Sequence, residues 1–517
     1  MSYTPTKNIP TPTNAERERE SMWLEEKHWG HRLWDQQSPW LTFLEFLCAA
    51  SSAHQAGHLF DFDKSQYPSE YLAHGRVHLR NILFNNEQQI SRIADTHGDN
   101  TTAWTKWLAW IESNSRGLDA AQRNFSYLRQ RFDSFHEFAT LVKALRSCIV
   151  EGDSNKRWSS RFIFPFGPAA IFEDLSIKDE KPSRDYVNFG RSGELLYHML
   201  SRSEIRNELA KALPPRVLDG GNKWCQLVDR LQPPTQDNPA RRGVASFLPY
   251  DSHPVFDLIA EDWLRLLGLR LPGFDVIPYL VTSGAFGLML YQLHTSAKIV
   301  GGVEKPSMIC EVVAPKKGLV RELSIESFEE NSSLSVEAME RLIGAAEDDP
   351  KWNFGETDND RLQSRRAVLE GLFRWSDDGQ SKHPDDLLKQ LRNEAKERHK
   401  RHFGQVHRSF GRGIGLVSRR GTNRFRYAPT DHFLKCLVFA TVSKRVEFSE
   451  FLSQLYERYG LVFGEREAEH AKSEQGIDKK PFQQNALRLE HRLGSLGLLK
   501  RLSDACAYVE NPYSSQT

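Results

Sequence analysis

The C-terminal part of the chain, residues 429–517, carries the pattern that most constrains the fold. Apolar residues recur there at helical spacing, and short runs typical of strands separate them. The expected elements are, in chain order, a helix at 431–441, a strand at 446–448, helices at 450–459 and 483–495, and strands at 498–503 and 505–509. This is the order of a winged helix, a helix-turn-helix variant whose third helix usually enters the DNA major groove. The sequence therefore predicts a C-terminal winged helix.

Charge is distributed unevenly, although the whole chain is nearly neutral. The 517 residues contain 69 Lys and Arg against 68 Asp and Glu, but residues 382–426 contain 13 Lys and Arg against 4 Asp and Glu. His, Phe and Tyr alternate with the arginines there, and such a mixture can neutralise phosphates and stack on bases. The alternative is a solvated helix face, which is what most charge runs are. The residues that we expect to contact DNA phosphates are Arg401, Arg408, Arg412, Arg419, Arg420, Arg424 and Arg426.

The expected winged helix itself has no net charge. Residues 431–517 contain 12 Lys and Arg and 12 Asp and Glu, which also suits a module that docks onto another protein. Its third helix and its wing nevertheless carry polar and basic side chains that can reach a groove or a phosphate. These are Gln484, Asn485, Arg488 and Arg492 on the helix, and Lys500 and Arg501 on the wing.

The remaining pattern is mostly helical, so the predicted fold class is mainly α, multidomain, with a mixed α/β middle region. Helices are expected at 40–56, 71–84, 103–114 and 136–149, and strands at 161–166, 186–190 and 308–313. Numerous tryptophans between Trp23 and Trp110 are expected to pack in the core. The expected regions are a disordered tail at 1–13, a helical N-terminal domain at 14–150, a mixed α/β domain at 151–325, a helical region with a basic end at 326–428, and the winged helix at 429–517.

Cysteine usage and hydropathy favour a reduced, cytoplasmic protein. The six cysteines stand singly, without a CxxC pair, and the polar N-terminus has no apolar stretch of a signal peptide. Residues 276–293 approach the length of a membrane span but include Pro278 and Gln292. We therefore expect a buried helix there and no contact with a membrane.

No cofactor or metal is expected. His54 and His58 are four residues apart on a probable helix, but a metal site needs three or four converging ligands. Phosphate-binding signatures of the GxxxxGK[ST] or GxGxxG kind are absent at strand–helix junctions. The chain offers one weaker anion candidate, Arg191, which follows Gly190 beside the start of a helix.

A metal-dependent nuclease is the enzymatic alternative. Such a site would use Asp275 and Glu311 with Lys316 or Lys317. In nucleases of this kind, an acid and a lysine on the same face of one strand reach the same metal ion. The lysines follow Glu311 by five and six residues rather than two, and Pro315 intervenes. The non-catalytic alternative is that these side chains lie at the surface or at an interface.

Four segments resemble uncharacterised accessory proteins of bacterial anti-phage defence islands. They are RFIFPFGPAAIFEDL, FGRSGELLYHMLSRS, CEVVAPKKGLVRELS and RLSDACAYVENPY, at 161–175, 189–203, 310–324 and 501–513. The resemblance implies a defence context with DNA as the object, and it transfers no functional residue.

These observations together predict a non-catalytic subunit that binds or senses double-stranded DNA in a bacterial defence complex. Its partners would be other subunits, such as a translocase, helicase or nuclease. The alternatives are the nuclease described above and a docking scaffold whose winged helix binds another subunit.

Overall fold

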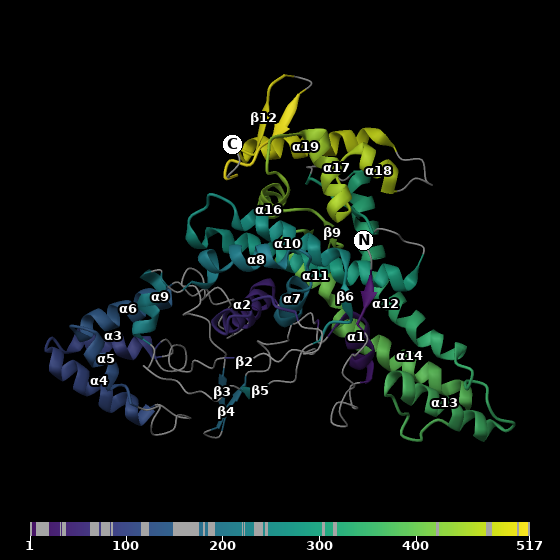
Figure 1. Ribbon diagram of the computed structural model, residues 1–517, viewed down its shortest axis with the longest axis horizontal. Helices are drawn as coiled ribbons and strands as arrows, with labels where there is room; N and C mark the ends of the chain where they lie inside the picture. The colour runs from purple at the N-terminus through teal and green to yellow at the C-terminus, as the bar shows by residue number, and fades with distance from the viewer. Residues whose placement is uncertain are drawn as a thin grey trace.

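The structure, a computed structural model, is mainly helical, which confirms the predicted fold class (Figure 1). It describes residues 3–6, 20–30, 33, 38–62, 72–73, 83, 86–114, 124–147, 175–178, 181–184, 192–219, 221, 223–231, 241–242, 247–301, 306–313, 318–419, 423–471, 478–503 and 506–514.

The central core is built around α11 (Ile277–Val300), which is buried on nearly all sides. Its sequence has no Asp, Glu, Lys or Arg before Lys298, so every face can pack against protein. Gly287 allows a close approach to α10 (Pro254–Leu267), because a Cβ there would lie 2.3 Å from Cγ1 of Ile259. The other helices around α11 are α2 (Pro39–Gln55), α12 (Leu319–Gly344), α15 (Val406–Gly413) and α16 (Asp431–Thr441).

The buried helix that we expected at 276–293 is therefore confirmed. No described helix combines the length and the apolar composition that a bilayer crossing requires.

The lobe at the left of Figure 1 has a hydrophobic core of its own, separate from the central core. Trp104 and Trp107 are fully buried in it against Phe135 and Phe138, as expected for core tryptophans. Its helices are α3 (Glu87–Thr96), α4 (Asn100–Asn114), α5 (Ser126–Arg131), α6 (Phe135–Ser147) and α9 (Lys223–Arg230). The expected N-terminal domain is thus divided, because α2 belongs to the central core instead.

A second lobe extends from the far end of α12 (Figure 1). It consists of α13 (Asp358–Phe373) and α14 (Pro384–Arg401), which pack with α1 (Glu20–Trp29). Leu24 and Trp352 are buried in its core.

The middle region is also mostly helical where it is described. It contains α7 (Ser192–Ser201), α8 (Arg206–Ala212) and the short helices η6 (Pro214–Leu218) and η7 (Gly273–Val276). Two further short helices, η8 (Ala345–Asp348) and η9 (Phe403–Gln405), follow α12 and α14.

Most strands form small two-stranded pairs. These are β1 (Thr4–Pro5) with β6 (Tyr250–Ser252), β2 (Leu72–Ala73) with β5 (Arg241–Arg242), β3 (Leu175–Lys178) with β4 (Lys181–Arg184), β7 (Met308–Ile309) with β11 (Leu461–Val462), and β8 (Val417–Ser418) with β9 (Arg426–Tyr427).

Two expectations need correction. Residues 3–6 are not a free tail, because Thr4–Pro5 pairs with β6 and the Tyr3 ring packs edge-on against His253 at 4.7 Å. The helix expected at 71–84 is wrong at Leu72–Ala73, which is a strand. The strands expected at 161–166 and 186–190 lie outside the described residues.

The C-terminal unit contains the helices and strands that the sequence predicted, in the predicted order, with α18 and β11 in addition. After α16 come β10 (Val446–Glu447), α17 (Phe448–Tyr459), β11, α18 (Glu465–Ala471), α19 (Lys479–Ser495), β12 (Leu499–Arg501) and β13 (Ala507–Val509). The antiparallel sheet has the order β10–β13–β12. Gly497, with φ of +72°, follows α19 where a stop was expected. Whether this unit is a winged helix stays a prediction.

Candidate nucleic-acid interface

Two exposed arginines lie against the ring of Phe425. The guanidinium carbons of Arg408 and Arg419 lie 5.4 and 4.9 Å from the ring centroid. Arg412 is exposed one helical turn after Arg408 on α15. The Phe425 ring also packs against Phe328 of α12, with the ring centroids 5.6 Å apart. We call Arg408, Arg412, Arg419 and Phe425 the arginine cluster.

Tertiary structure brings this cluster together from three elements. Arg408 and Arg412 lie on α15, Arg419 follows β8, and Phe425 precedes β9. Gly411 lets α15 approach β8, because a Cβ there would be 2.5 Å from Cγ2 of Val417. Within the described part of the chain, neither Arg412 nor Arg419 has an acidic partner.

Other basic residues of the segment are already paired with carboxylates. Arg424 binds Glu329 of α12, and Arg401 binds Glu397 at 3.2 Å. Both pairs are exposed, so solvent screens them and each stabilises little. The acidic face of α12 therefore offsets part of the basic charge. Arg420 lies outside the described residues.

Arg426, which the sequence placed among the phosphate-contacting residues, is not at the surface. Its side chain is buried and forms an ion pair with the buried Glu311, beside Tyr427. The hydroxyl of Tyr427 lies 2.6 Å from Nε2 of His407, and burial lowers the pKa of that histidine to about 4. Arg426 thus belongs to a buried polar network that joins β9 to α15 and to the chain after β7.

Asn485 is also misplaced in the predicted DNA interface. It is fully buried, and its side-chain amide donates to the carbonyl oxygens of Cys310 and Phe463, both at 3.0 Å. Its carbonyl accepts from the backbone N–H of Val312 at 2.8 Å. The sequence contains one signal for this burial, the helical spacing. Asn485 lies four residues before the buried Leu489, so both side chains are on the same face of α19.

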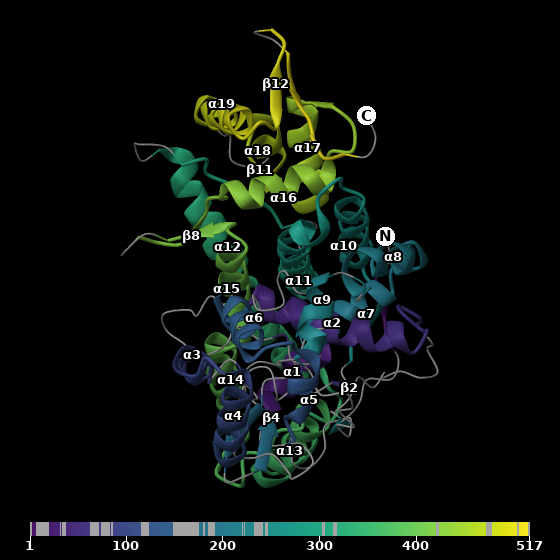
Figure 2. The same ribbon diagram turned by 90° about the vertical axis from the view of Figure 1, so that its left-hand side faces the viewer.

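The outward face of α19 carries Gln484, Leu487 and His491, all exposed. Arg488 is partly buried and has no ion-pair partner among the described residues. Arg492 donates to the carboxylate of Asp431 at 2.6 Å, so it fixes α19 to α16. Figure 2 places β8 and α19 toward the same edge of the molecule, and both β9 and α19 contact α12 between them.

The hairpin β12–β13 extends beyond α19 (Figure 1). Lys500 is exposed on it, whereas Arg501 pairs with Glu490 of α19 at 3.4 Å. Leu502 is 57% exposed next to them. This surface therefore mixes basic and apolar side chains.

The two nuclease candidates that the structure describes, Glu311 and Asp275, are in different environments. Glu311 is neutralised by Arg426 inside the protein, whereas Asp275 is exposed at η7. Lys316 and Lys317 lie outside the described residues. Among the described residues, no three His, Cys, Asp or Glu side chains are grouped so that they could hold a metal ion. Glu311 is therefore a structural residue in the described structure.

The sequence suggested an anion site beside Arg191, at the N-terminus of α7. A carboxylate of the protein itself already binds at this N-terminus. The Glu45 carboxylate accepts the backbone N–H of Gly193 at 2.8 Å and is fully buried. A Cβ on Gly193 would lie 2.2 Å from the Thr42 carbonyl oxygen, which places α7 directly on the backbone of α2. Arg191 lies outside the described residues.

The sequence did not reveal a buried serine–histidine–glutamate arrangement. Nδ1 of His399 lies 2.8 Å from the Glu25 carboxylate, and Nε2 lies 3.0 Å from the Ser335 hydroxyl. These spacings suit nucleophilic catalysis, but the three side chains are at most 5% exposed. They connect α1, α14 and α12, which is a structural role. No sequence signal links residues that far apart.

No protein-family model, curated protein or solved structure matches this chain. The resemblance to defence-island proteins therefore remains a hypothesis.

Proposed function

We propose that this protein binds double-stranded DNA and that the arginine cluster contacts its phosphates. The observation that carries the proposal is the pair Arg412 and Arg419, two exposed guanidinium groups that have no acidic partner within the described residues, beside a third arginine. Such groups release condensed counterions when they bind phosphates, which makes binding strongly dependent on salt. Gln484, Leu487 and His491 on α19 would face a groove of the same duplex.

The role that follows is a DNA-binding or DNA-sensing subunit without catalysis of its own. The anti-phage defence context, with a translocase, helicase or nuclease as partner, rests on the sequence resemblance alone. Neither Glu311 nor the buried His399 supports an enzymatic role, because both are enclosed by protein.

The test is a fluorescence-anisotropy titration of labelled duplex DNA at several salt concentrations. The double variant Arg412→Ala/Arg419→Ala should weaken binding and reduce the slope of log affinity against log salt by about 2. The matched control removes two exposed cations from the α3–α6 lobe, Arg92 and Lys106, and should leave the slope unchanged. Equal affinity and slope in both variants would contradict the proposal.

A protein-docking role for α19 is the second candidate. It is favoured by Leu487 and Leu502, which are 44% and 57% exposed on α19 and after β12. In that case, Leu487→Ser/Leu502→Ser would abolish binding to a partner subunit, while affinity for DNA would be retained.

A further inference from the structure

Arg424 lies at the border of the arginine cluster, but a carboxylate of the protein already binds it. It directly precedes Phe425, the ring that Arg408 and Arg419 contact. Nε of Arg424 donates to Oε1 of Glu329 at 2.8 Å, and Nη2 donates to the other carboxylate oxygen. Two parallel bonds of this kind are also the geometry in which a guanidinium binds a phosphate. Glu329 therefore uses the donors of Arg424 that a DNA phosphate would need.

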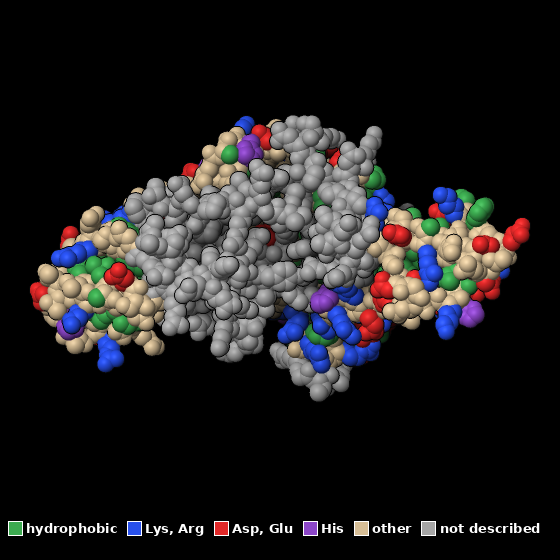
Figure 3. Space-filling view, turned by 90° about the horizontal axis from the view of Figure 1, so that it is seen from below, with side chains coloured by type: hydrophobic (Ala, Val, Ile, Leu, Met, Phe, Trp, Pro, Cys, Tyr) green, Lys and Arg blue, Asp and Glu red, His purple; other side chains and the backbone are tan. Residues whose placement is uncertain are grey.

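Glu329 belongs to the same surface as the arginine cluster. The residue before it, Phe328, packs against the ring of Phe425. The exposed carboxylates of α12 in this part of the helix recur at helical spacing, at Glu322, Glu326, Glu329 and Glu330. Figure 3 shows Lys and Arg side chains next to Asp and Glu at the lower edge of the view, on the side where Figure 2 places β8. A duplex that binds the cluster would thus approach these carboxylates.

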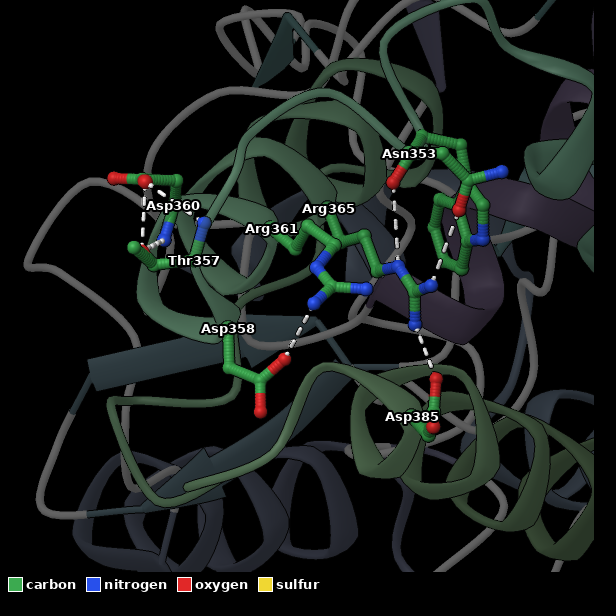
Figure 4. A network of polar contacts seen from close by, with 8 residues as sticks. Asn353, Thr357, Asp358, Asp360, Arg361, Arg365 and Asp385 are labelled. Carbon is green, nitrogen blue, oxygen red and sulfur yellow. Dashed lines mark hydrogen bonds and ion pairs between the residues drawn. The ribbon is translucent and has the colours of Figure 1, made fainter.

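The ion pair of Arg424 and Glu329 can be exchanged at little cost. Its two side chains are 62% and 48% exposed, so water solvates both charges once the pair separates. Arg365 of α13 is a contrasting case, because its side chain is 11% exposed and donates to both Asp385 and the Asn353 side chain (Figure 4). An enclosed arginine of that kind could not turn toward a ligand without losing several contacts, whereas Arg424 would exchange one anion for another.

We propose, building on the function proposed above, that Glu329 competes with DNA phosphate for Arg424 and so limits the affinity of the arginine cluster for duplex DNA. In the free protein, Glu329 neutralises Arg424. When a duplex binds, Arg424 turns to a phosphate, and the carboxylate that it leaves repels the same duplex. The pair is thus an autoinhibitory contact. Removing the carboxylate charge should strengthen binding, which the mere loss of a structural contact would not do.

The test is a fluorescence-anisotropy titration of labelled duplex DNA at several salt concentrations, with the full-length Glu329→Gln variant. Its affinity should rise about fivefold at physiological salt, because one more phosphate is neutralised. For the same reason, the slope of log affinity against log salt should steepen by about 1. Adding Arg424→Ala to Glu329→Gln should remove both gains.

Two matched variants separate the effect of the ion pair from that of charge alone. Glu322→Gln removes another exposed carboxylate from the same helix. Asp358→Asn releases Arg361, its partner at 2.9 Å in the distant α13 lobe (Figure 4). Neither variant should steepen the slope, and both should raise the affinity less than Glu329→Gln does. An equal gain in Glu322→Gln, or a gain that persists without Arg424, would overturn the competition.

Failure of the competition and failure of DNA binding give different results. Unchanged affinity and slope in Glu329→Gln, together with the losses expected for Arg412→Ala/Arg419→Ala, would overturn the competition and leave DNA binding by the cluster intact. If Arg412→Ala/Arg419→Ala also bound like the native protein, or if the native protein did not bind DNA, both proposals would fail. Because the ion pair is exposed, Glu329→Gln should leave the melting temperature almost unchanged, which controls for folding.

Discussion

At the scale of single residues, the buried ion pair of Glu311 and Arg426 separates a structural role from a catalytic one. Removing one partner leaves the other charged and buried, which costs about 3–5 kcal/mol. Glu311→Gln should therefore lower the free energy of unfolding by that order, measured by urea denaturation at neutral pH. Glu322→Gln, at an exposed position on α12, should change it little. An unchanged stability with a lost metal-dependent cut would instead support the nuclease.

His407 gives the protein a predictable sensitivity to acid. Burial lowers its pKa from 6.5 to about 4, so the unfolded chain binds the proton more tightly. The stability contributed by neutral His407 is complete above pH 6.5 and is lost as the pH falls toward 4, on the order of 3 kcal/mol in total. Between pH 7.5 and pH 5, the free energy of unfolding should fall less in His407→Gln than in the native protein. Urea denaturation at the two pH values measures this. Parallel losses in the two proteins would contradict this assignment.

At the scale of elements, one buried amide determines how α19 is held. Asn485 satisfies three backbone groups, of Cys310, Val312 and Phe463. Asn485→Ala should leave them unpaired and destabilise the protein by roughly 3 kcal/mol. Gln484→Ala, one residue away on the outward face, should cost less than about 0.5 kcal/mol. If thermal melting ranked the two variants in the opposite order, the assignment of the two faces would be wrong.

The elements themselves were largely predictable where periodicity was strong. The helix at 431–441 and the strand at 446–448 follow from apolar spacing, and both are present. In the segment 411–427, residues 411–413 end α15, and Val417–Ser418 pairs antiparallel with Arg426–Tyr427.

At the scale of the whole molecule, the C-terminal unit shares the central core instead of forming its own. Phe286 of α11 contacts Phe433 and Tyr459 at 5.2 and 5.3 Å. Arg458 donates to Asp262 of α10 at 2.6 Å, and burial raises the pKa of that carboxyl to about 6. The unit is therefore fixed to α10 and α11 by apolar and charged contacts.

This sharing predicts that residues 429–517 do not fold alone. Excision would expose the apolar faces of α16 and α17 that α10 and α11 cover. Circular dichroism of the isolated fragment should give weak helicity without a cooperative melt, and co-expression with 1–428 should restore it. A cooperative transition in the fragment would identify an autonomous domain.

The sequence by itself determined the helical class, the buried character of α11, the order of elements in the C-terminal unit, and the concentration of positive charge in 382–426. Periodicity and composition are local properties, so they can be read along the chain. Tertiary structure alone decided which cations are free. It buried Arg426 against Glu311, paired Arg424 with Glu329, and left Arg412 and Arg419 exposed. The two pairs Arg424–Glu329 and Arg426–Glu311 join residues 95 and 115 positions apart, and no local pattern encodes such contacts.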